Sequence, residues 1–227
     1  QYAAGRQNPA LLEALVDYTL NRHYPDQQAS DNKALALLDA VMERQLDLIV
    51  HWMRVGFIHG VLNTDNVTLS GEGIDFGPCA FMDSFDPDTV FSSIDHQGRY
   101  AYGNQPTITQ WNLSRFAETL LPLIDEDVDS AIEKATAVIK SFNQRYSEKW
   151  LAMMKKKLGL FGDDPVDEKL ITDLLEWMKT QRADYTNTFR DITRETFPEH
   201  RDYQDDAFIN WHQRWQVRLG RNRKPLK

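Results

Sequence analysis

Hydrophobic residues recur every three or four positions along most of the chain, which is the spacing of one face of an α-helix. The first such segment follows Asn8-Pro9, a pair suited to the cap and first turn of a helix. Its expected buried face consists of Leu12, Leu15, Val16 and Leu20. The pattern therefore predicts a helix at the start of the chain and, because it recurs, a mainly helical protein.

The longest predicted helix runs from about residue 31 to residue 55 and stops at Gly56, since glycine commonly ends helices. Its apolar stripe consists of Leu38, Val41, Met42, Leu48, Ile49, Trp52 and Met53. The same periodicity predicts further helices over residues 109–121, 127–158 with a break near Ser147, 166–179, 183–195 and 203–219. Asp163-Asp164-Pro165 is the clearest break between these helices.

Strand signals are confined to a short stretch around the turn at residues 70–73. Residues 67–69 have the composition of a short strand, and Ile74 begins the return strand. Such a hairpin would bring Asn66 and Asp75 together at its open end. The expected fold class is therefore mainly α, or α+β, with one short β-hairpin.

The composition is that of a soluble globular protein: 227 residues, 41% hydrophobic and 26% charged. A formal net charge of −8 argues against a nucleic-acid partner, because phosphate binding needs a basic surface. No apolar run reaches the roughly 18–20 residues of a membrane span, so no membrane partner is expected. The single cysteine, Cys79, excludes a disulfide within the chain and favours a reducing compartment. We expect the cytoplasm, or the mitochondrion for a eukaryotic source.

One group of residues is typical of the metal-binding half of a kinase active site. His59 and Asn66 have the spacing of the histidine and asparagine of the kinase catalytic loop, and Asp75-Phe76-Gly77 follows them. Magnesium prefers oxygen ligands, so the amide oxygen of Asn66 and the carboxylate of Asp75 would suit it. The sequence therefore predicts that the chain can hold a metal ion together with a nucleotide.

One position departs from the kinase pattern. Val61 stands where a kinase has its catalytic aspartate, and valine cannot accept a proton. Asp65 supplies a carboxylate four residues further on, beside Asn66 and at the rim of the same cleft. A purely structural interpretation stays open at this point, in which Asp75 caps a turn, Asn66 satisfies loop backbone and His59 is a buried histidine.

Other polar and aromatic groups have ordinary structural interpretations. Trp211 and Trp215 lie four residues apart on one helix face, which is usual for core residues. Residues 95–100 form a polar and aromatic loop that is either locked by its own hydrogen bonds or in contact with a protein substrate. We expect two basic clusters to be solvated helix surfaces. These clusters are Lys155, Lys156 and Lys157, and Arg214, Arg218, Arg221, Arg223 and Lys224.

The stretch from His59 to Leu123 closely resembles the selenoprotein O family. The resemblance reaches back through residues 11–53 and weakens beyond about Ser141. The family usually has Tyr where this chain has Phe76, which is a conservative difference. The segments that carry the resemblance are HGVLNTDN, VTLSGEGIDFGPCAFMDSFDP, SSIDHQGRYAYGNQPTITQWNLSRFAETLLPLI and, earlier in the chain, NRHYP.

The resemblance implies a protein-kinase-like fold and a particular reaction. Family members transfer AMP, rather than phosphate, from ATP to the Ser, Thr or Tyr hydroxyls of proteins. By resemblance, Asp65 is the proton acceptor, and Asn66 and Asp75 bind the metal ion and, through it, ATP. The implied cofactor is Mg²⁺, with Mn²⁺ as the alternative, and the implied partners are ATP and protein substrates.

The resemblance also implies that the chain is part of a longer protein. Family members have an N-terminal lobe with a glycine-rich segment, a lysine and arginines that grip the nucleotide phosphates, and we find no such segment here. We therefore expect a single kinase-like C-lobe over residues 1–227, truncated at both ends. Residues 1–140 would hold the core helices and the metal-site loop, and residues 141–227 a helical extension. The isolated piece is expected to be inactive.

Two other classes of function compete with this one. A small-molecule or protein kinase-like phosphotransferase would use similar H-G-x-L and I-D-F segments, but it would keep an aspartate where Val61 stands. A pseudokinase scaffold, which binds partners without turnover, suits the loss of that aspartate. It does not suit the retention of Asn66 and Asp75.

Overall fold

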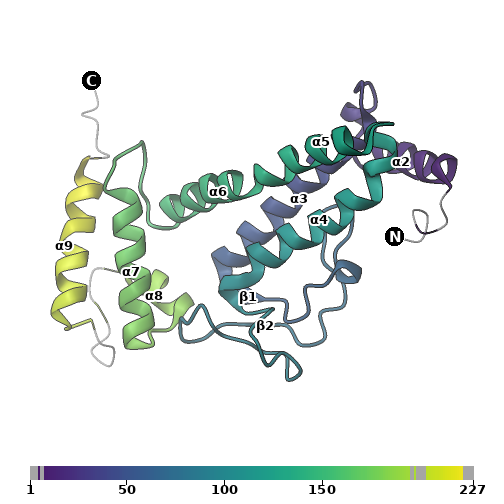
Figure 1. Ribbon diagram of the computed structural model, residues 1–227. Helices are drawn as coiled ribbons and strands as arrows, with labels where there is room; N and C mark the ends of the chain where they lie inside the picture. The colour runs from purple at the N-terminus through teal and green to yellow at the C-terminus, as the bar shows by residue number, and fades with distance from the viewer. Residues whose placement is uncertain (1–4, 6–7, 195–196, 198–202, 222–227) are drawn as a thin grey trace.

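The computed structural model describes residue 5, residues 8–194, residue 197 and residues 203–221. In this part of the chain most residues are helical, and the strands form one two-stranded antiparallel sheet (Figure 1). The helices are α2 (Pro9–His23), α3 (Lys33–Val55), α4 (Gln105–Ile124), α5 (Val128–Lys140), α6 (Phe142–Lys157), α7 (Asp167–Gln181), α8 (Tyr185–Asp191) and α9 (Asp206–Arg221). The short elements are η1 (Pro25–Gln27), β1 (Phe57–Ile58), η2 (Thr64–Asn66), β2 (Ala80–Phe81) and η3 (Tyr102–Asn104). The expectation of a mainly helical fold is confirmed.

The ends of the first two long helices are fixed by the residues that the sequence indicates. The side chain of Asn8 accepts a hydrogen bond from the Leu11 N–H at 3.1 Å and so caps α2. Asn32 caps α3 in the same way, and Gly56 ends it in the left-handed conformation, with φ at +71°. Capping therefore sets where α3 delivers the chain into the loop that follows.

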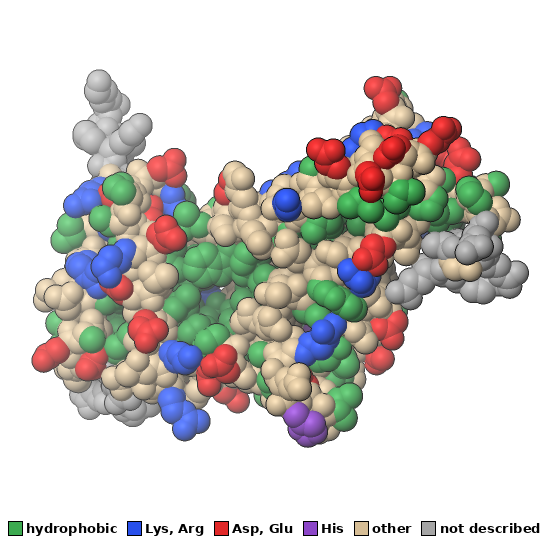
Figure 2. All heavy atoms as spheres, viewed as in Figure 1, with side chains coloured by type: hydrophobic (Ala, Val, Ile, Leu, Met, Phe, Trp, Pro, Cys, Tyr) green, Lys and Arg blue, Asp and Glu red, His purple; other side chains and the backbone are tan. Residues whose placement is uncertain are grey.

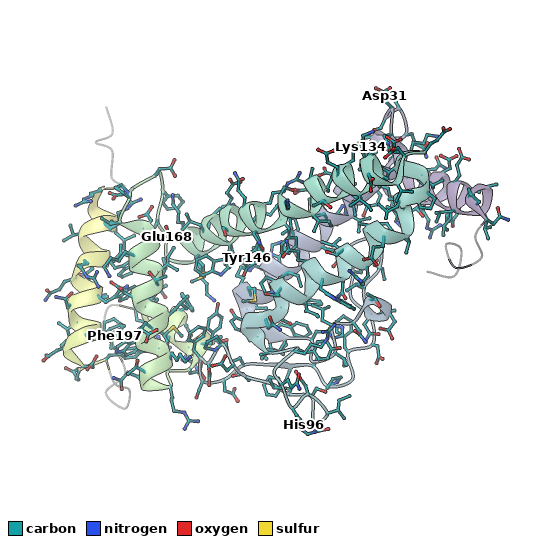
Figure 3. All side chains as sticks on the ribbon, viewed as in Figure 1. Asp31, His96, Lys134, Tyr146, Glu168 and Phe197 are labelled. Carbon is teal, nitrogen blue, oxygen red and sulfur yellow. The ribbon has the colours of Figure 1, made fainter. Side chains whose placement is uncertain are left out.

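The side chains pack into two hydrophobic clusters that share α3. One cluster lies between α2, the first half of α3, α4 and α5, and the other joins the end of α3 to α6, α7, α8 and α9. Figure 1 shows α3 and α4 side by side at the centre, with α7, α8 and α9 gathered at one end. Tyr146 of α6 packs against both clusters (Figure 3). The expected buried face of α2 is confirmed at Leu12, Val16 and Leu20, whereas Leu15 is 44% exposed.

The strands do not lie where the sequence placed them. β1 pairs antiparallel with β2, with Phe57 opposite Phe81. Residues 67–69 and Ile74 do not form the predicted hairpin strands, and this part of the prediction was wrong. The segment contains only an isolated bridge between Val67 and Gly73.

The reason lies in how tightly the segment closes. The Thr68 N–H donates to the Glu72 carbonyl at 2.9 Å, and the Thr68 hydroxyl accepts the Glu72 N–H at 3.0 Å. Gly71, at φ +88°, lies so close to α3 that a Cβ there would be 2.4 Å from the Cβ of Arg44. These contacts hold a compact loop against the helix, in which strand pairing is limited to the bridge between Val67 and Gly73.

The helix predicted over residues 127–158 is in fact two helices, and they separate at Ser141 rather than near Ser147. The Ser141 hydroxyl donates to the Val138 carbonyl at 2.7 Å, and its N–H does so at 3.1 Å. A serine that bonds back to its own helix in this way competes with continuation of the helix. The helix predicted over residues 183–195 corresponds to α8, which ends at Asp191. The expected end at residue 195 lies outside the described residues.

The arginine cluster near the end of the chain is not simply a solvated surface. Arg218 is buried, and its Nε lies 2.6 Å from a carboxylate oxygen of Asp167. Arg221 is exposed but pairs with Asp164 at 2.8 Å. Acidic and basic side chains are accordingly interspersed over this end of the molecule (Figure 2). Arg223 and Lys224 lie outside the described residues.

The three lysines at the end of α6 also differ from expectation. Of the three, only Lys156 is exposed, and the other two are partly buried. Lys155 pairs with two carboxylates, and the Lys157 ammonium lies 4.0 Å and 3.8 Å from the centres of the Tyr185 and Phe189 rings. The prediction of a solvated helix surface was therefore wrong for Lys155 and Lys157.

The two tryptophans of α9 are core residues, as expected. The rings of Trp211 and Trp215 are stacked with centroids 5.9 Å apart. Their indole N–H groups donate to the carbonyls of Leu170 and Leu158 at 2.8 and 2.9 Å. No helix in the described ranges is both long enough and apolar enough to cross a membrane.

Candidate active site

His59 is a fully buried residue that ties the start of the site loop to its end. Its Nδ1 accepts the Val61 N–H at 3.3 Å, so its Nε2 carries the proton that is donated to the Ile74 carbonyl at 3.0 Å. The His59 N–H donates to the side-chain oxygen of Gln105 at 3.0 Å. Burial lowers the pKa of His59, so the ring is held neutral. This agrees with the structural interpretation of His59 as a buried histidine.

Three buried carboxamides on α3 and α4 hold the same loop by its backbone. Each side-chain NH₂ group donates to one loop carbonyl: Gln105 to Phe57 at 3.0 Å, Asn112 to Leu62 at 3.0 Å and Gln45 to Thr68 at 2.8 Å. The sequence-based prediction did not identify any of these three residues as contacts of the loop. A signal was available, because Gln45 interrupts the apolar stripe of α3 and the other two lie seven residues apart on one face of α4.

Asn66 is 8% exposed and sits at the end of η2. Its backbone N–H donates to the Asn63 carbonyl at 3.0 Å, and its side-chain Nδ2 donates to the Val61 carbonyl at 2.8 Å. The second bond fixes the orientation of the amide. The Oδ1 atom of Asn66 is therefore the atom left to accept a bond or coordinate a cation.

The backbone brings the three predicted site residues into one loop. The Ile74 N–H donates to the Asn66 carbonyl at 2.9 Å, so Asp75 follows directly after a residue bonded to Asn66. Asp65 precedes Asn66 on η2, and both aspartates are exposed. The negative charge of Asp75 reaches the His59 ring, where it partly opposes the effect of burial on the pKa. Asp65 thus directly precedes Asn66 in the chain, and Asp75 directly follows the residue that is bonded to Asn66.

Asp75 has a backbone conformation that few residues adopt. Its φ of +57° is left-handed, a region that aspartate enters more readily than most non-glycine residues do. Its Oδ1 lies 3.7 Å from where a Cβ on Gly77 would be, so the carboxylate folds back over the glycine. Asp adopts this conformation in ordinary turns, and strained backbone positions also cluster at active sites and ligand-binding loops.

An aromatic cluster lies beside the carboxylates. The ring of Phe76 lies 5.1 Å from that of His59, 6.0 Å from Phe57 and 6.3 Å from Trp52, measured between centroids. Phe76 is still 45% exposed, and Phe81 on β2 is 62% exposed. The cluster gives the site an apolar wall that is open on one side in this chain.

The donor set is compatible with magnesium that also binds a nucleotide. In the ranges that the structure describes, no three histidine, cysteine, aspartate or glutamate side chains converge as a metal cage would require. Magnesium is usually held by only one or two protein carboxylates, with waters and substrate phosphates completing its shell. The fixed amide oxygen of Asn66 and the exposed carboxylate of Asp75 fit that smaller requirement.

Comparison with known proteins identifies the family. A sequence model described as protein adenylyltransferase SelO matches residues 3–223. The chain belongs to the SelO family. The resemblance read from residues 59–123 is therefore confirmed over nearly the whole chain.

Curated relatives within the SelO family carry the name protein nucleotidyltransferase YdiU. The protein of Alcanivorax borkumensis is 70% identical over 226 residues, which are 100% of this chain and 47% of the relative. That of Nitrosococcus oceani is 56% identical, covering 100% of this chain and 46% of the relative, and that of Pelagibacter ubique is 54% identical, covering 96% and 45%. The chain thus spans somewhat less than half the length of the curated relatives that it matches.

The loop at residues 95–100 in this SelO chain is locked by its own hydrogen bonds. The carboxylate of Asp95 accepts the N–H groups of Gln97, Arg99 and Tyr100 at 3.3, 3.0 and 2.8 Å. These bonds lower the pKa of Asp95, although partial burial opposes them. His96 lies at the tip of the loop and points away from the protein (Figure 3). Contact of this loop with a protein substrate stays a prediction.

Proposed function

We propose that this chain is part of a protein adenylyltransferase that transfers AMP from ATP to Ser, Thr or Tyr hydroxyls of other proteins. The observation that carries the proposal is the hydrogen bond between Asn66 and Ile74, which joins Asp65, Asn66 and Asp75 in one loop. Membership of the SelO family supports the adenylyl group as the group transferred. ATP and protein substrates are the proposed partners, and nucleic acid is not.

In this proposal Asp65 is the general base. Its carboxylate is exposed at the loop surface, so an acceptor hydroxyl can approach it. As the hydroxyl oxygen attacks the α-phosphorus, its proton passes to Asp65, the bond between the α-phosphorus and its bridging oxygen breaks, and pyrophosphate leaves. Val61, which stands where a kinase has its base, takes no part in proton transfer.

Asn66 and Asp75 are the proposed metal ligands. Asn66 offers its Oδ1 because Nδ2 is bound to the Val61 carbonyl, and Asp75 offers an exposed carboxylate beside it. A bound Mg²⁺, or Mn²⁺ in its place, would neutralise phosphate charge. The buried His59 and the three carboxamides keep the backbone of this loop in position, which is most of what a nucleotidyl transfer site requires of its protein.

We further propose that the fold is the C-lobe of a protein-kinase-like enzyme. The open aromatic side formed by Phe76 and Phe81 supports this proposal, since such a patch suits contact with a second lobe. Residues 1–140 would form the core of the lobe and residues 141–227 a helical extension of it. The complete protein would act in the cytoplasm, or in the mitochondrion of a eukaryote.

Isotopic labelling tests the proposal. The complete protein is incubated with Mg²⁺, an acceptor protein and ATP labelled either on the α- or on the γ-phosphate, and the mass of the intact acceptor is measured. We expect α-label in the acceptor and a mass increase equal to AMP. Incorporation of γ-label would favour the phosphotransferase, and no incorporation would favour the scaffold. The 227-residue chain alone is expected to transfer nothing, because half of the phosphate-binding groups of the family lie outside it.

A further inference from the structure

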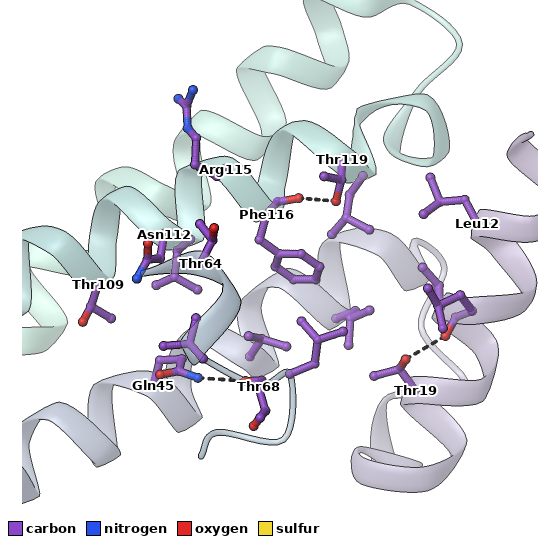
Figure 4. A pocket seen from close by; sticks show the side chains of 18 residues that line it. Leu12, Thr19, Gln45, Thr64, Thr68, Thr109, Asn112, Arg115, Phe116 and Thr119 are labelled. Carbon is purple, nitrogen blue, oxygen red and sulfur yellow. Dashed lines mark hydrogen bonds between the residues drawn. The ribbon is translucent and has the colours of Figure 1, made fainter. Parts of the chain in front are cut away.

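Two hollows in the described part of the molecule differ in charge. One is a cavity of about 280 Å³ between α2, α3 and α4, and the side chains that line it are mainly apolar (Figure 4). Arg115, the one charged residue among them, points away from the cavity. The other is an open groove of about 640 Å³ between α3, α6 and α8, lined by four lysine and arginine residues and one aspartate. The groove is therefore the hollow that can select a charged ligand.

The groove combines an apolar floor with a basic rim. Three buried apolar side chains form the floor: Val50, Met153 and Phe189. Three exposed basic side chains, the rim residues, are His51, Arg54 and Lys156. The lining runs over residues 47–55 of α3 and 149–157 of α6. Eight helical residues rise by about 12 Å, a length that roughly four residues of extended peptide would cover.

The rim lies where a row of ion pairs between α3 and α6 ends. Acidic residues of α3 pair with basic residues of α6 at 2.8 to 3.0 Å, in the order Arg145–Asp39, Arg145–Glu43, Lys149–Glu43 and Lys149–Asp47. Beyond this row both helices present basic groups to the groove. None of the three rim residues forms an ion pair with a described residue. Their side chains are thus exposed and without a carboxylate partner.

Lys157 adds a partly buried cation to the lining of the groove. Its ammonium donates to the Arg54 carbonyl and lies 4.0 Å and 3.8 Å from the centres of the Tyr185 and Phe189 rings. Burial lowers the pKa of Lys157, and the positive charge of Arg54 lowers it further. Arg54 and Lys157 therefore repel each other, and a negative group bound at the rim would relieve that repulsion.

The helix dipole does not by itself account for this concentration of basic groups. The dipole favours a basic side chain in the last turn of any helix, and Arg22 of α2 and Lys140 of α5 are examples outside the groove. The whole chain has 34 acidic and 26 basic residues. The groove reverses that balance, and its one carboxylate, Asp47, is already paired with Lys149.

We propose that the groove between α3, α6 and α8 docks a short acidic segment of a partner protein. One apolar side chain of the segment would cover the floor, and its carboxylates would pair with the rim residues. A small inorganic anion would leave the apolar floor uncovered. A nucleic acid would be repelled by the net charge of −8 on the chain as a whole.

The docking is independent of the proposed adenylyl transfer, because none of the groove residues belongs to the site loop and the contact needs neither ATP nor metal. An acceptor protein that carries such a segment would be a suitable partner, and this link alone rests on the proposed function. Peptide binding without ATP therefore tests the groove whether or not the chain is part of an adenylyltransferase.

A matched series of peptides tests the proposal in the complete protein, without ATP or metal. The probe is acetyl-Glu-Glu-Leu-Glu-Glu-amide, and binding is measured by ligand-observed saturation-transfer NMR titration at low ionic strength. We expect a Kd on the order of 1 mM. The peptide with Gln in place of every Glu keeps the shape but loses the charge, and it should bind at least about tenfold more weakly. The peptide with Gly in place of Leu loses the apolar contact and should bind at least about fivefold more weakly.

Two charge-reversed proteins locate the binding site. Arg54→Glu combined with Lys156→Glu reverses two exposed charges of the rim and should weaken binding of the acidic peptide at least about tenfold. Arg22→Glu combined with Lys140→Glu is the matched control, because it makes the same change of charge in the last turns of two other helices. The control should bind the peptide within about twofold of the unaltered protein, since exposed charges far from the groove are screened by salt.

Several results would overturn the proposal. Equal weakening in the two charge-reversed proteins would mean that overall charge, rather than the groove, attracts the peptide. Equal binding of the Glu and Gln peptides, or no binding of either, would exclude an acidic segment. Displacement of the peptide by an equal concentration of sulfate, or of an oligothymidylate, would assign the rim to a small anion or to nucleic acid. If the rim variant fails to fold, the peptide series in the unaltered protein still decides.

Discussion

The site loop of residues 59–77 and the terminal unit of α7, α8 and α9 use charged side chains in opposite ways. In the terminal unit the carboxylate of Asp167 is buried and paired with Arg218, and Asp191 is fully buried beside arginines. In the loop, Asp65 and Asp75 are exposed, and neither forms an ion pair within the described residues. Carboxylates therefore form buried ion pairs in the terminal unit, whereas those of the site loop are exposed.

The loop compensates by taking its structural bonds from neutral groups. His59, which burial keeps neutral, and the carboxamides of Gln45, Gln105 and Asn112 bind loop backbone from three sides. Neutral donors and acceptors can fix a backbone without attracting the nearby carboxylates into ion pairs. This difference supports the proposal that Asp65 and Asp75 act on a ligand rather than stabilise the fold.

The largest expected effect is loss of nucleotide binding when Asp75 loses its charge. Asp75→Asn in the complete protein keeps the shape of the side chain and its tolerance of the left-handed φ, but it removes the carboxylate. Metal-dependent binding of ATP, measured by calorimetry with and without Mg²⁺, should become undetectable. The thermal unfolding temperature should barely change. Undiminished Mg²⁺-dependent ATP binding would rule out Asp75 as a metal ligand.

The next effect concerns Asp65. Asp65→Ala should lower the rate of AMP transfer by about 10²–10⁴-fold, which is the usual contribution of a general base. Binding of ATP should persist, because Asp65 is not a proposed metal ligand. Steady-state transfer of α-label measures the rate, and Asp83→Ala, an exposed aspartate after β2, serves as the matched control. A decrease no larger than that of the control would exclude Asp65 as the base.

The sequence predicted those parts of the fold that depend on local chemistry. Asn8 and Gly56 set helix ends because capping involves only neighbouring residues. The spacing of Asp65, Asn66 and Asp75 along the chain likewise allowed the sequence to indicate them as candidate site residues. The hairpin was misplaced because its outcome depends on Gly71 packing against Arg44, a contact between distant parts of the chain. The carboxamides that hold the loop were missed for the same reason, since their partners lie 23 to 50 residues away.

In the terminal unit the same kind of substitution should affect stability instead of chemistry. Arg218→Met removes the buried partner of the Asp167 carboxylate and leaves only Lys155, 3.3 Å away, to pair with it, and breaking a buried pair typically costs about 3–5 kcal/mol. Arg221→Met, the matched control, removes an exposed partner of Asp164 and should cost less than about 1 kcal/mol. Urea unfolding of both variants measures the difference. Equal losses would show that burial does not distinguish the two pairs.

Lys157 lies at the end of α6, between the end of α3 and α8. Its ammonium donates to the Arg54 carbonyl at the end of α3, and it faces the rings of Tyr185 and Phe189. Burial, with a smaller contribution from the positive charge of Arg54, lowers the pKa of Lys157 to about 7. Lys157 is therefore charged at a cost to the folded state.

The smallest predicted effect is a pH dependence that comes from this lysine. Between pH 7 and pH 9 the unfolded chain holds the Lys157 proton while the folded chain releases it, so stability rises with pH in this window. The unfolding free energy of the unaltered protein, relative to that of Lys157→Met, should therefore increase by about 2 kcal/mol from pH 7 to pH 9. Lys156→Met, which removes a solvated neighbour, should produce no such trend. A flat difference for Lys157→Met across this range would mean that the two aromatic rings and the Arg54 carbonyl hold the charged form well enough to offset its burial.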